Sequence, residues 1–197
     1  RALLRAAADL TGAERAALSL DRWMRMELHR LIDAVRGAYR DYEFHRALRL
    51  LYGFCVNQAS SIYLSAVKDR LYCELPDSPR RQAAQAVIRE TLVALVKLMA
   101  PIIPHTCEEA WGHVPFTPAG EDDSVHLSPL PVPDADMLAA ATEEPPAHPA
   151  DILASPDDAL AAPHNWIWRQ VMAARSAALA QLERLKGEGV KNSLDTE

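Results

Sequence analysis

The sequence predicts an all-α protein, an antiparallel bundle of about five helices with a long acidic, proline-rich connection. Apolar residues recur at steps of three and four through most of the chain, and the alternating runs typical of strands are almost absent. Ten of the 14 prolines fall between Pro115 and Pro163, so one proline-rich stretch interrupts the helical pattern. Packing amphipathic helices against one another is the economical way to bury their apolar faces.

A first long helix is expected from Leu20 onward. An apolar stripe marks the side that packs on the rest of the protein, at Met24, Leu28, Leu31, Val35, Ala38 and Tyr42. The opposite side is polar and mostly basic, with Arg22, Arg25, His29, Asp33, Arg36 and Arg40. A second apolar-rich stretch follows from about Glu43 to Leu71. Polar residues in its middle, Asn57, Ser60 and Ser61, suggest a kink or a division into two helices.

Ser78-Pro79 predicts the start of a third helix, because Ser is a good N-cap and Pro fits the first helical position. This helix is expected to run to about Ala100. It becomes apolar almost all round after Thr91, which indicates a central, surrounded helix. After Pro101 and Pro104, Thr106 with Glu109 is typical of a capping box that opens a short helix through Trp111.

The composition of Phe116–Ala162 predicts an extended connection, because a stretch so rich in Pro, Asp and Glu forms neither a long helix nor a packed core. Within it, Ser124–Leu127 is expected to be extended and docked on the body. A last helix is expected over Asn165–Lys186, with Gly187 as its C-cap.

Four segments are therefore predicted along the chain. Residues 1–19 are interpreted as a connection from a preceding domain, and 20–115 as the helical bundle. Residues 116–162 form the acidic linker with its short extended segment. Residues 163–197 form a C-terminal helix and a turn leading onward. Neither end of the sequence looks like a natural terminus, so we interpret the chain as a fragment.

The charge is unevenly distributed, which limits the possible partners. Residues 1–97 hold 16 Lys and Arg against 11 Asp and Glu, whereas 98–168 hold no Lys or Arg and 12 Asp and Glu. A mildly basic helical body can meet a polyanion locally without binding polyanions indiscriminately. No signal peptide or membrane span is expected, and three widely spaced cysteines favour a reducing, cytoplasmic location and no structural zinc site.

Motifs for catalysis are missing from the sequence. There is no Gly-rich phosphate loop, no His-Glu-x-x-His spacing and no Gly-x-Ser-x-Gly elbow. The adjacent Glu108 and Glu109 point about 100° apart on a helix and do not easily share a substrate. We therefore expect no catalytic residue and no metal site in this chain.

The basic residues allow two readings. Arg22 and Arg25 lie on the first helix, Lys68 and Arg70 near the end of the second stretch, and Arg80 and Arg81 at the start of the third helix. Interleaved acidic residues favour a solvated helix surface. The alternative is that these six residues contact RNA phosphates, which position RNA without reading its sequence. Trp23, Tyr39 and Tyr42 could stack on unpaired bases, although aromatic residues at helical spacing more often lie in the core.

A series of short motifs in one register resembles a known family. The runs are Leu20-Asp21-Arg22-Trp23, Tyr42-Glu43-Phe44-His45, Ser60-Ser61-Ile62-Tyr63-Leu64, Lys68-Asp69-Arg70-Leu71-Tyr72, Ala100-Pro101-Ile102-Ile103-Pro104-His105-Thr106 and Lys191-Asn192-Ser193-Leu194. In this order they are similar to the anticodon-binding bundle of isoleucyl-, valyl- and leucyl-type tRNA synthetases, the isoleucyl branch in particular. The acidic stretch Phe116–Ala162 is longer than that resemblance leads us to expect.

The resemblance implies a tRNA-binding domain of an isoleucyl-tRNA synthetase, an ATP-dependent ligase. It implies two partners: isoleucine tRNA, bound on its anticodon-stem side, and the catalytic domain of the same polypeptide. The family uses ATP and magnesium, and many members carry zinc in a module after this region; the motifs for these sites do not occur here, so the fragment alone is expected to be inactive. Two alternatives stay open: the same domain of a valyl enzyme, and a helical protein-interaction module without an RNA partner.

Overall fold

The computed structural model describes residues 12–114, 123–142 and 165–187. Its elements are α2 (Gly12–Arg40), α3 (Phe44–Gly53), the π-helix η2 (Phe54–Leu64), α4 (Lys68–Cys73), α5 (Pro79–Met99), α6 (Pro104–Gly112), α7 (Ala135–Thr142) and α10 (Asn165–Gly187). No strand occurs in these three ranges, which confirms the all-α prediction. None of the helices described is long and apolar enough to cross a membrane. The expectations for residues 1–11, 116–122, 143–162 and 191–194 fall outside the described residues.

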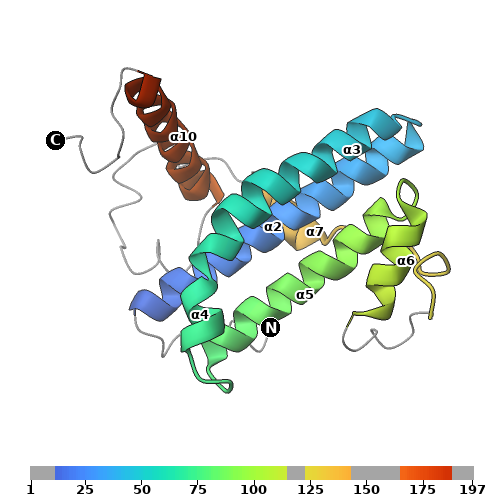
Figure 1. Cartoon of the computed structure of the whole chain (residues 1–197), viewed down its shortest axis with the longest axis horizontal. Coiled ribbons are helices and arrows are strands. Elements are labelled where there is room, and N and C mark those ends of the chain that lie inside the picture. The colour runs from blue at the N-terminus through green and yellow to red at the C-terminus, as the bar shows by residue number, and fades with distance from the viewer. Residues whose placement is uncertain (1–11, 115–122, 143–164, 188–197) are drawn as a thin grey trace.

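Three long helical stretches make the body of the protein (Figure 1). The stretch formed by α3 and η2 runs antiparallel to α2, and α5 then runs back in the direction of α2. The short α4 lies at the end of the bundle where α5 begins, and α6 lies at the other end of α5. This arrangement creates two ends of the bundle with different chemistry, one at α4 and one at the α2–α3 turn.

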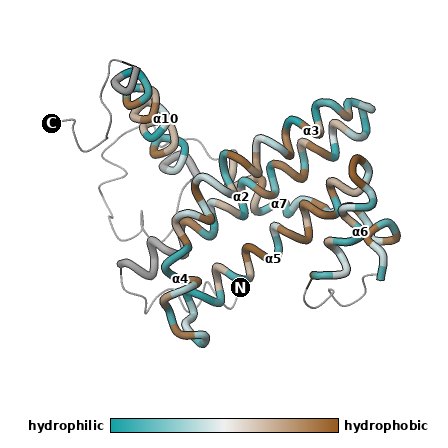
Figure 2. Tube along the Cα trace, viewed as in Figure 1, coloured by the Kyte–Doolittle hydropathy of each residue, from teal (hydrophilic) through white to brown (hydrophobic). Residues whose placement is uncertain are grey.

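The core lies around α2, which is buried on more than one side. Met24, Met26, Leu28 and Val35 of α2 are almost fully buried. They pack in one cluster with side chains from α3, η2, α5 and α7. Figure 2 shows hydrophobic residues recurring along α2, α3 and α5. The prediction that the third helix is the central one is therefore wrong: Leu92 of α5 is exposed, and α2 takes the central position because α7 covers its remaining side.

The second apolar stretch bends by a change of helix type. Its backbone passes from α3 into the π-helix η2, which includes Asn57, Ser60 and Ser61, and the next helix, α4, begins at Lys68 after a turn at Val67. The Ser61 hydroxyl donates a hydrogen bond to the Asn57 carbonyl oxygen. Serine hydroxyls and asparagine amides can bond to nearby backbone groups and so compete with the regular backbone hydrogen bonds of an α-helix. The expected irregularity is confirmed, and its form is a wide π-helical segment.

The start of α5 is as predicted, but the start of α6 is not. Pro79 is the first residue of α5 and Ser78 precedes it, although the Ser78 hydroxyl bonds to Glu74 and does not cap the helix. Helix α6 begins at Pro104, two residues before Thr106, and no side chain caps it. The predicted capping box is therefore wrong, because Thr106 already lies within the first turn.

The proline-rich connection contains more structure than its composition predicts. Ser124–Leu127 forms a turn, not an extended segment, and Val125 is buried against α6 and the end of α5. Residues 129–142, which we call the strap, cross α2 and end in α7. The Asp134 carboxylate accepts hydrogen bonds from the N–H groups of Asp136 and Met137, and thereby caps α7. Ala141 is buried in the main core.

The last described helix leaves the bundle at an angle. Trp168 and Met172 of α10 pack on the core, and the Trp168 ring lies 5.5 Å from the ring of Trp23. Further along α10, Val171 and Leu179 are exposed. Figure 1 shows α10 projecting away from α2. The extent of the predicted helix is confirmed, and within the described residues only its first turns are packed.

Candidate nucleic-acid interface

Arg70 is buried in the joint between three helices. Its guanidinium donates to both oxygens of the Asp21 carboxylate at 3.1 and 3.2 Å, and the Tyr63 hydroxyl donates to Asp21 Oδ1 at 2.7 Å. Burial raises the pKa of Asp21, while the Tyr63 hydrogen bond and the Arg70 charge oppose that rise. Since Arg70 is only 6% exposed, it holds α4 to α2 and is not available to a phosphate. The expectation that Arg70 lies on an RNA-contacting surface is corrected here.

Arg80 and Arg81 are grouped around Glu74 in the turn that joins α4 to α5. Arg80 Nε lies 3.4 Å from Glu74 Oε1, and an Arg81 N–H donates to the Glu74 carbonyl oxygen at 2.8 Å. Both side chains are half-buried, so their positions are set by the turn. Each Nε–H group is buried and has no hydrogen-bond acceptor among the described residues.

Lys68 and Arg22 complete this end of the molecule. Lys68 is exposed and makes no ion pair with a described residue, and Arg22 is half-buried beside Asp21. Burial raises the pKa of Asp21, and Arg80 is close enough for its charge to be among the groups that oppose this rise. The four cations Arg22, Lys68, Arg80 and Arg81 therefore gather at one end of the bundle, which we call the basic end.

The basic end is only mildly positive. Positions 21, 22 and 68–81 contain five basic and four acidic residues, a net charge of +1. Long-range attraction of a polyanion by this end is therefore weak. Any phosphate binding has to come from short-range contacts of individual side chains.

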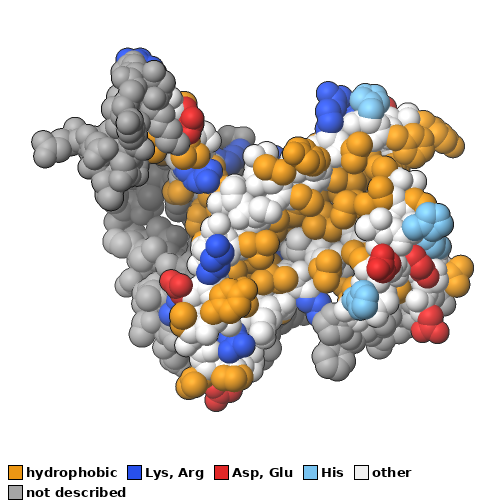
Figure 3. Space-filling view, viewed as in Figure 1, with side chains coloured by type: hydrophobic (Ala, Val, Ile, Leu, Met, Phe, Trp, Pro, Cys, Tyr) orange, Lys and Arg blue, Asp and Glu red, His pale blue; other side chains and the backbone are white. Residues whose placement is uncertain are grey.

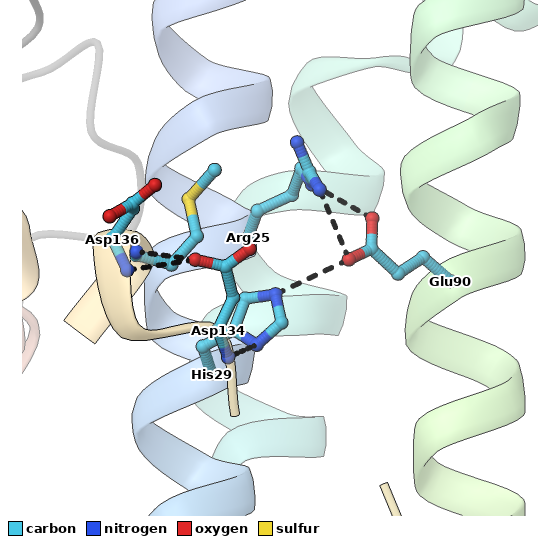
Figure 4. Close-up of polar contacts among 6 residues, drawn as sticks. Arg25, His29, Glu90, Asp134 and Asp136 are labelled. Atoms are coloured by element: carbon cyan, nitrogen blue, oxygen red, sulfur yellow. Dashed lines mark hydrogen bonds and ion pairs between the residues drawn. The ribbon is translucent and has the colours of Figure 1, made fainter. Parts of the chain in front are cut away.

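Arg25 belongs to a different group. Its Nε donates to Glu90 Oε2 of α5 at 2.8 Å, and His29 Nε2 lies 3.4 Å from Glu90 Oε1 (Figure 4). On its other nitrogen, Nδ1, His29 accepts the N–H of Asp134 at 3.1 Å. Although burial pushes the pKa of Glu90 up, the hydrogen bond to His29 and the charge of Arg25 hold it below its ordinary value. Arg25 thus fastens α2 to α5 beside the strap.

The strap covers much of the polar side of α2 that the sequence suggested would face solvent. Arg36 donates to the carbonyl oxygens of Leu130 and Pro131 at 3.3 and 3.0 Å. Together with His29, it fixes the strap across the helix. Polar residues on this side of α2 therefore hold a second segment of chain in place.

The three candidate stacking residues have three different environments. Trp23 is only 3% exposed and lies in the core. Tyr39 is partly buried, and its hydroxyl donates to the Leu98 carbonyl oxygen. Tyr42 is 81% exposed in the turn between α2 and α3. Its burial excludes Trp23 as a base-stacking residue. The exposure of Tyr42 shows that the prediction of this residue in the apolar stripe of the first helix is wrong.

Sequence reasoning missed the residues that organise the basic end. Asp21 and Tyr63 each lie in one of the short motifs described above. They are 42 residues apart, however, and nothing in the sequence indicates that their side chains are in contact. The signal that was available is the charge of Asp21 inside an apolar stripe, since a buried carboxylate requires a partner. A group of three or more His, Cys, Asp or Glu side chains that could hold a metal ion does not occur in the described part of the chain.

Comparison with known proteins gives a consistent result. The family model described as the anticodon-binding domain of tRNA ligase matches residues 21–189. The isoleucine–tRNA ligase of Carboxydothermus hydrogenoformans is 46% identical over 127 residues, which are 64% of this chain and 14% of that protein. The isoleucine–tRNA ligase of Desulforudis audaxviator is 36% identical over 179 residues, 90% of this chain and 17% of that protein. That of Bacillus subtilis is 43% identical over 125 residues, 64% of this chain and 13% of that protein. The chain thus spans less than a fifth of the length of these relatives.

Proposed function

Because the chain belongs to the anticodon-binding domain family of tRNA ligases, we propose that it binds isoleucine tRNA and positions it for a catalytic domain in the same polypeptide. The tRNA is held on its anticodon-stem side, and this binding takes place in the cytoplasm. Binding energy at such a remote site contributes to catalysis by orienting the reacting end of the substrate. The specific tRNA is proposed from the relatives, which are isoleucine–tRNA ligases.

The observation that carries the RNA-contacting part of this proposal is the gathering of Arg22, Lys68, Arg80 and Arg81 at one end of the bundle. They come from α2, α4 and α5. The buried pair of Asp21 and Arg70 fixes α4 relative to α2, and the contacts of Arg80 and Arg81 with Glu74 tie the start of α5 to the end of α4. Side chains held in this way contact phosphates at defined positions. Arg70 is left out of the proposed contact set because it is buried with Asp21, and Arg25 because its Nε donates to Glu90 at 2.8 Å. Arg80 stays in the set because its contact with Glu74 is longer, at 3.4 Å, and is not a hydrogen bond.

Two alternatives are less well supported. A valyl-type enzyme would use the same fold. The relatives compared above are isoleucine–tRNA ligases, however, and the alignment with one of them covers 90% of this chain. A protein-interaction module without RNA is the second alternative. It gains no support from the strap, because that acidic segment is fastened to α2 by Arg36 and His29.

Binding of tRNA to the chain in solution tests the proposal. Fluorescence anisotropy with labelled isoleucine tRNA should give a dissociation constant that rises about ten-fold for the double variant Lys68→Gln/Arg81→Gln, or roughly 1.4 kcal/mol. A noncognate tRNA should lose the same factor, because phosphate contacts carry no sequence information. Arg175→Gln is the matched control, since Arg175 is exposed on α10 and donates to the backbone carbonyl oxygen of Ser61 in η2, outside the basic end. No binding of tRNA by the unaltered chain would refute the proposal.

We propose further that the catalytic steps are carried out elsewhere. The sequence motifs for ATP, magnesium and zinc sites do not occur in this chain. The purified chain should therefore show no isoleucine-dependent exchange of pyrophosphate into ATP. A measurable exchange rate that scales with the concentration of the pure chain would contradict this.

A further inference from the structure

The turn between α2 and α3 has an unusual backbone for the residue that occupies it. Tyr42 has a φ of 59°, in the left-handed region that favours glycine. The Glu43 N–H bonds to the Ala38 carbonyl oxygen at 2.8 Å and the Tyr42 N–H to that of Tyr39 at 3.2 Å, so the end of α2 is a Schellman motif. Glycine is the usual residue at this position of the motif, and a tyrosine there is strained.

Tyr42 stands at the edge of an aromatic group that is open to solvent. The Phe44 ring lies 6.3 Å from the Tyr42 ring and 5.8 Å from the Tyr39 ring. Phe44 is 48% exposed, while Tyr39 is anchored below it by the bond to Leu98. We call Tyr39, Tyr42 and Phe44 the aromatic corner. The Phe44 ring packs on Tyr39, the Tyr42 ring packs on Phe44, and these two outer residues are both exposed.

Basic residues follow Phe44 along α3. The residues of α3 include His45, Arg46 and Arg49, all exposed, and no acidic residue. Glu43 pairs with Arg46 at 2.8 Å, whereas Arg49 makes no ion pair with a described residue. Figure 3 shows Lys or Arg and His side chains next to hydrophobic ones over this corner of the molecule. Aromatic rings interleaved with cations are the combination that binds unpaired bases and the phosphates between them.

We propose that the aromatic corner binds unpaired bases of the RNA, with Tyr42 and Phe44 stacking on bases and Arg49 contacting the adjoining phosphate. This inference rests on the proposed RNA-binding function and adds a second contact region at the end of the bundle opposite the basic end. About 20 residues of α2 separate the two regions, which corresponds to roughly 30 Å along the helix. The strain at Tyr42 supports the assignment, because glycine would close the same turn at less cost but without a ring.

A protein partner fits this corner less well. Interfaces between proteins are depleted of charge at their centre, and here the exposed His45, Arg46 and Arg49 follow Phe44 on the same helix. The rings themselves are arranged at angles of 49° and 73°, which leaves ring faces accessible from more than one direction. Bases splayed out of a single-stranded loop can approach such a surface one at a time.

The substitution Tyr42→Gly separates the contribution of the ring to RNA affinity from the loss of stability that the strained backbone causes. Binding to a labelled RNA hairpin with an unpaired loop of about eight nucleotides should weaken by about 5- to 100-fold, because a stacking contact is lost. In the same variant Tm should rise by about 2–4 °C, because the strained backbone is relieved. Tyr42→Phe keeps the ring and should bind the hairpin within about two-fold of the unaltered chain. Tyr52→Ala is the matched control, since Tyr52 is also well exposed, at 70%, but lies at the other end of α3 from Phe44 and outside the basic end.

The outcomes distinguish this inference from the proposed function. If the chain binds tRNA and the basic-end variant weakens it, but Tyr42→Gly binds the hairpin as tightly as the unaltered chain, the aromatic corner does not bind bases. The same holds if Tyr52→Ala loses as much affinity as Tyr42→Gly, because the effect is then not specific to the corner. If the unaltered chain binds neither tRNA nor the hairpin, the proposed function fails together with this inference.

Discussion

The two ends of the bundle use their polar and aromatic residues differently. At the basic end, Arg70 is buried with Asp21, and Arg80 and Arg81 hold the turn around Glu74. At the aromatic corner, Tyr42 and Phe44 are exposed, and the backbone at Tyr42 is strained. The comparison shows that a charged residue in a helical protein is often part of the structure. An exposed aromatic residue on a strained turn contributes little to stability and is better explained by an external partner.

The largest expected effect is the loss of stability when the buried pair of Asp21 and Arg70 is broken. Arg70→Met leaves the Asp21 carboxylate buried without a cation, and should lower the free energy of unfolding by about 3–5 kcal/mol. Urea unfolding followed by tryptophan fluorescence measures this, with Trp23 in the adjacent turn of α2. Lys68→Met, on the same helix but exposed, should change the free energy of unfolding by less than about 0.5 kcal/mol. A loss below about 1 kcal/mol for Arg70→Met would mean that the joint does not depend on this pair.

Removing the anchor of the aromatic corner should have a smaller effect. Tyr39→Phe keeps the ring under Phe44 but leaves the Leu98 carbonyl oxygen without its donor, so the free energy of unfolding should fall by about 1 kcal/mol. Equilibrium denaturation measures this loss. Affinity for the loop hairpin should change little, because the outer rings are still present. An equal loss of stability and of RNA affinity would show that the corner is a structural element.

The contacts of Arg25 and His29 with Glu90, which join α2 to α5, give a pH dependence. Despite burial, the pKa of Glu90 is lowered in the folded chain by its hydrogen bond to His29 and by its ion pair with Arg25. These contacts therefore stabilise the fold above pH about 4.5, and their contribution is lost as the pH falls through the lowered pKa. The pair is about one-third exposed, so we expect only about 0.5–1 kcal/mol. Glu90→Gln should flatten the acid side of a curve of unfolding free energy against pH. An unchanged curve would show that the pair contributes nothing.

The smallest expected effect is at Thr106. The sequence predicted a capping role, for which Thr106→Ala would cost about 1 kcal/mol. In the structure Thr106 is exposed inside the first turn of α6, so the substitution should change the free energy of unfolding by less than about 0.5 kcal/mol. A loss near 1 kcal/mol in urea unfolding would restore the original interpretation.

Helical periodicity predicted the helices well because it depends on local spacing. The start of α5 at Pro79 and the span of α10 follow directly from residues adjacent in sequence. The contacts that decide which cations are free could not be predicted in this way, since Asp21 and Arg70 are 49 residues apart. The strap shows the same limit: its prolines correctly excluded a long helix, but its docking depends on His29 and Arg36, far earlier in the chain.

The central claim is that the basic end contacts phosphates and the aromatic corner contacts bases. The most direct test is the salt dependence of tRNA affinity for the unaltered chain, Lys68→Gln/Arg81→Gln and Tyr42→Gly. Each lost phosphate contact should reduce the slope of log affinity against log salt by about 0.7–0.9, so the double variant should lose about 1.4–1.8. Tyr42→Gly should give a line parallel to that of the unaltered chain but displaced to weaker binding. An unchanged slope for the double variant, or a slope reduced as much by Tyr42→Gly, would contradict the account.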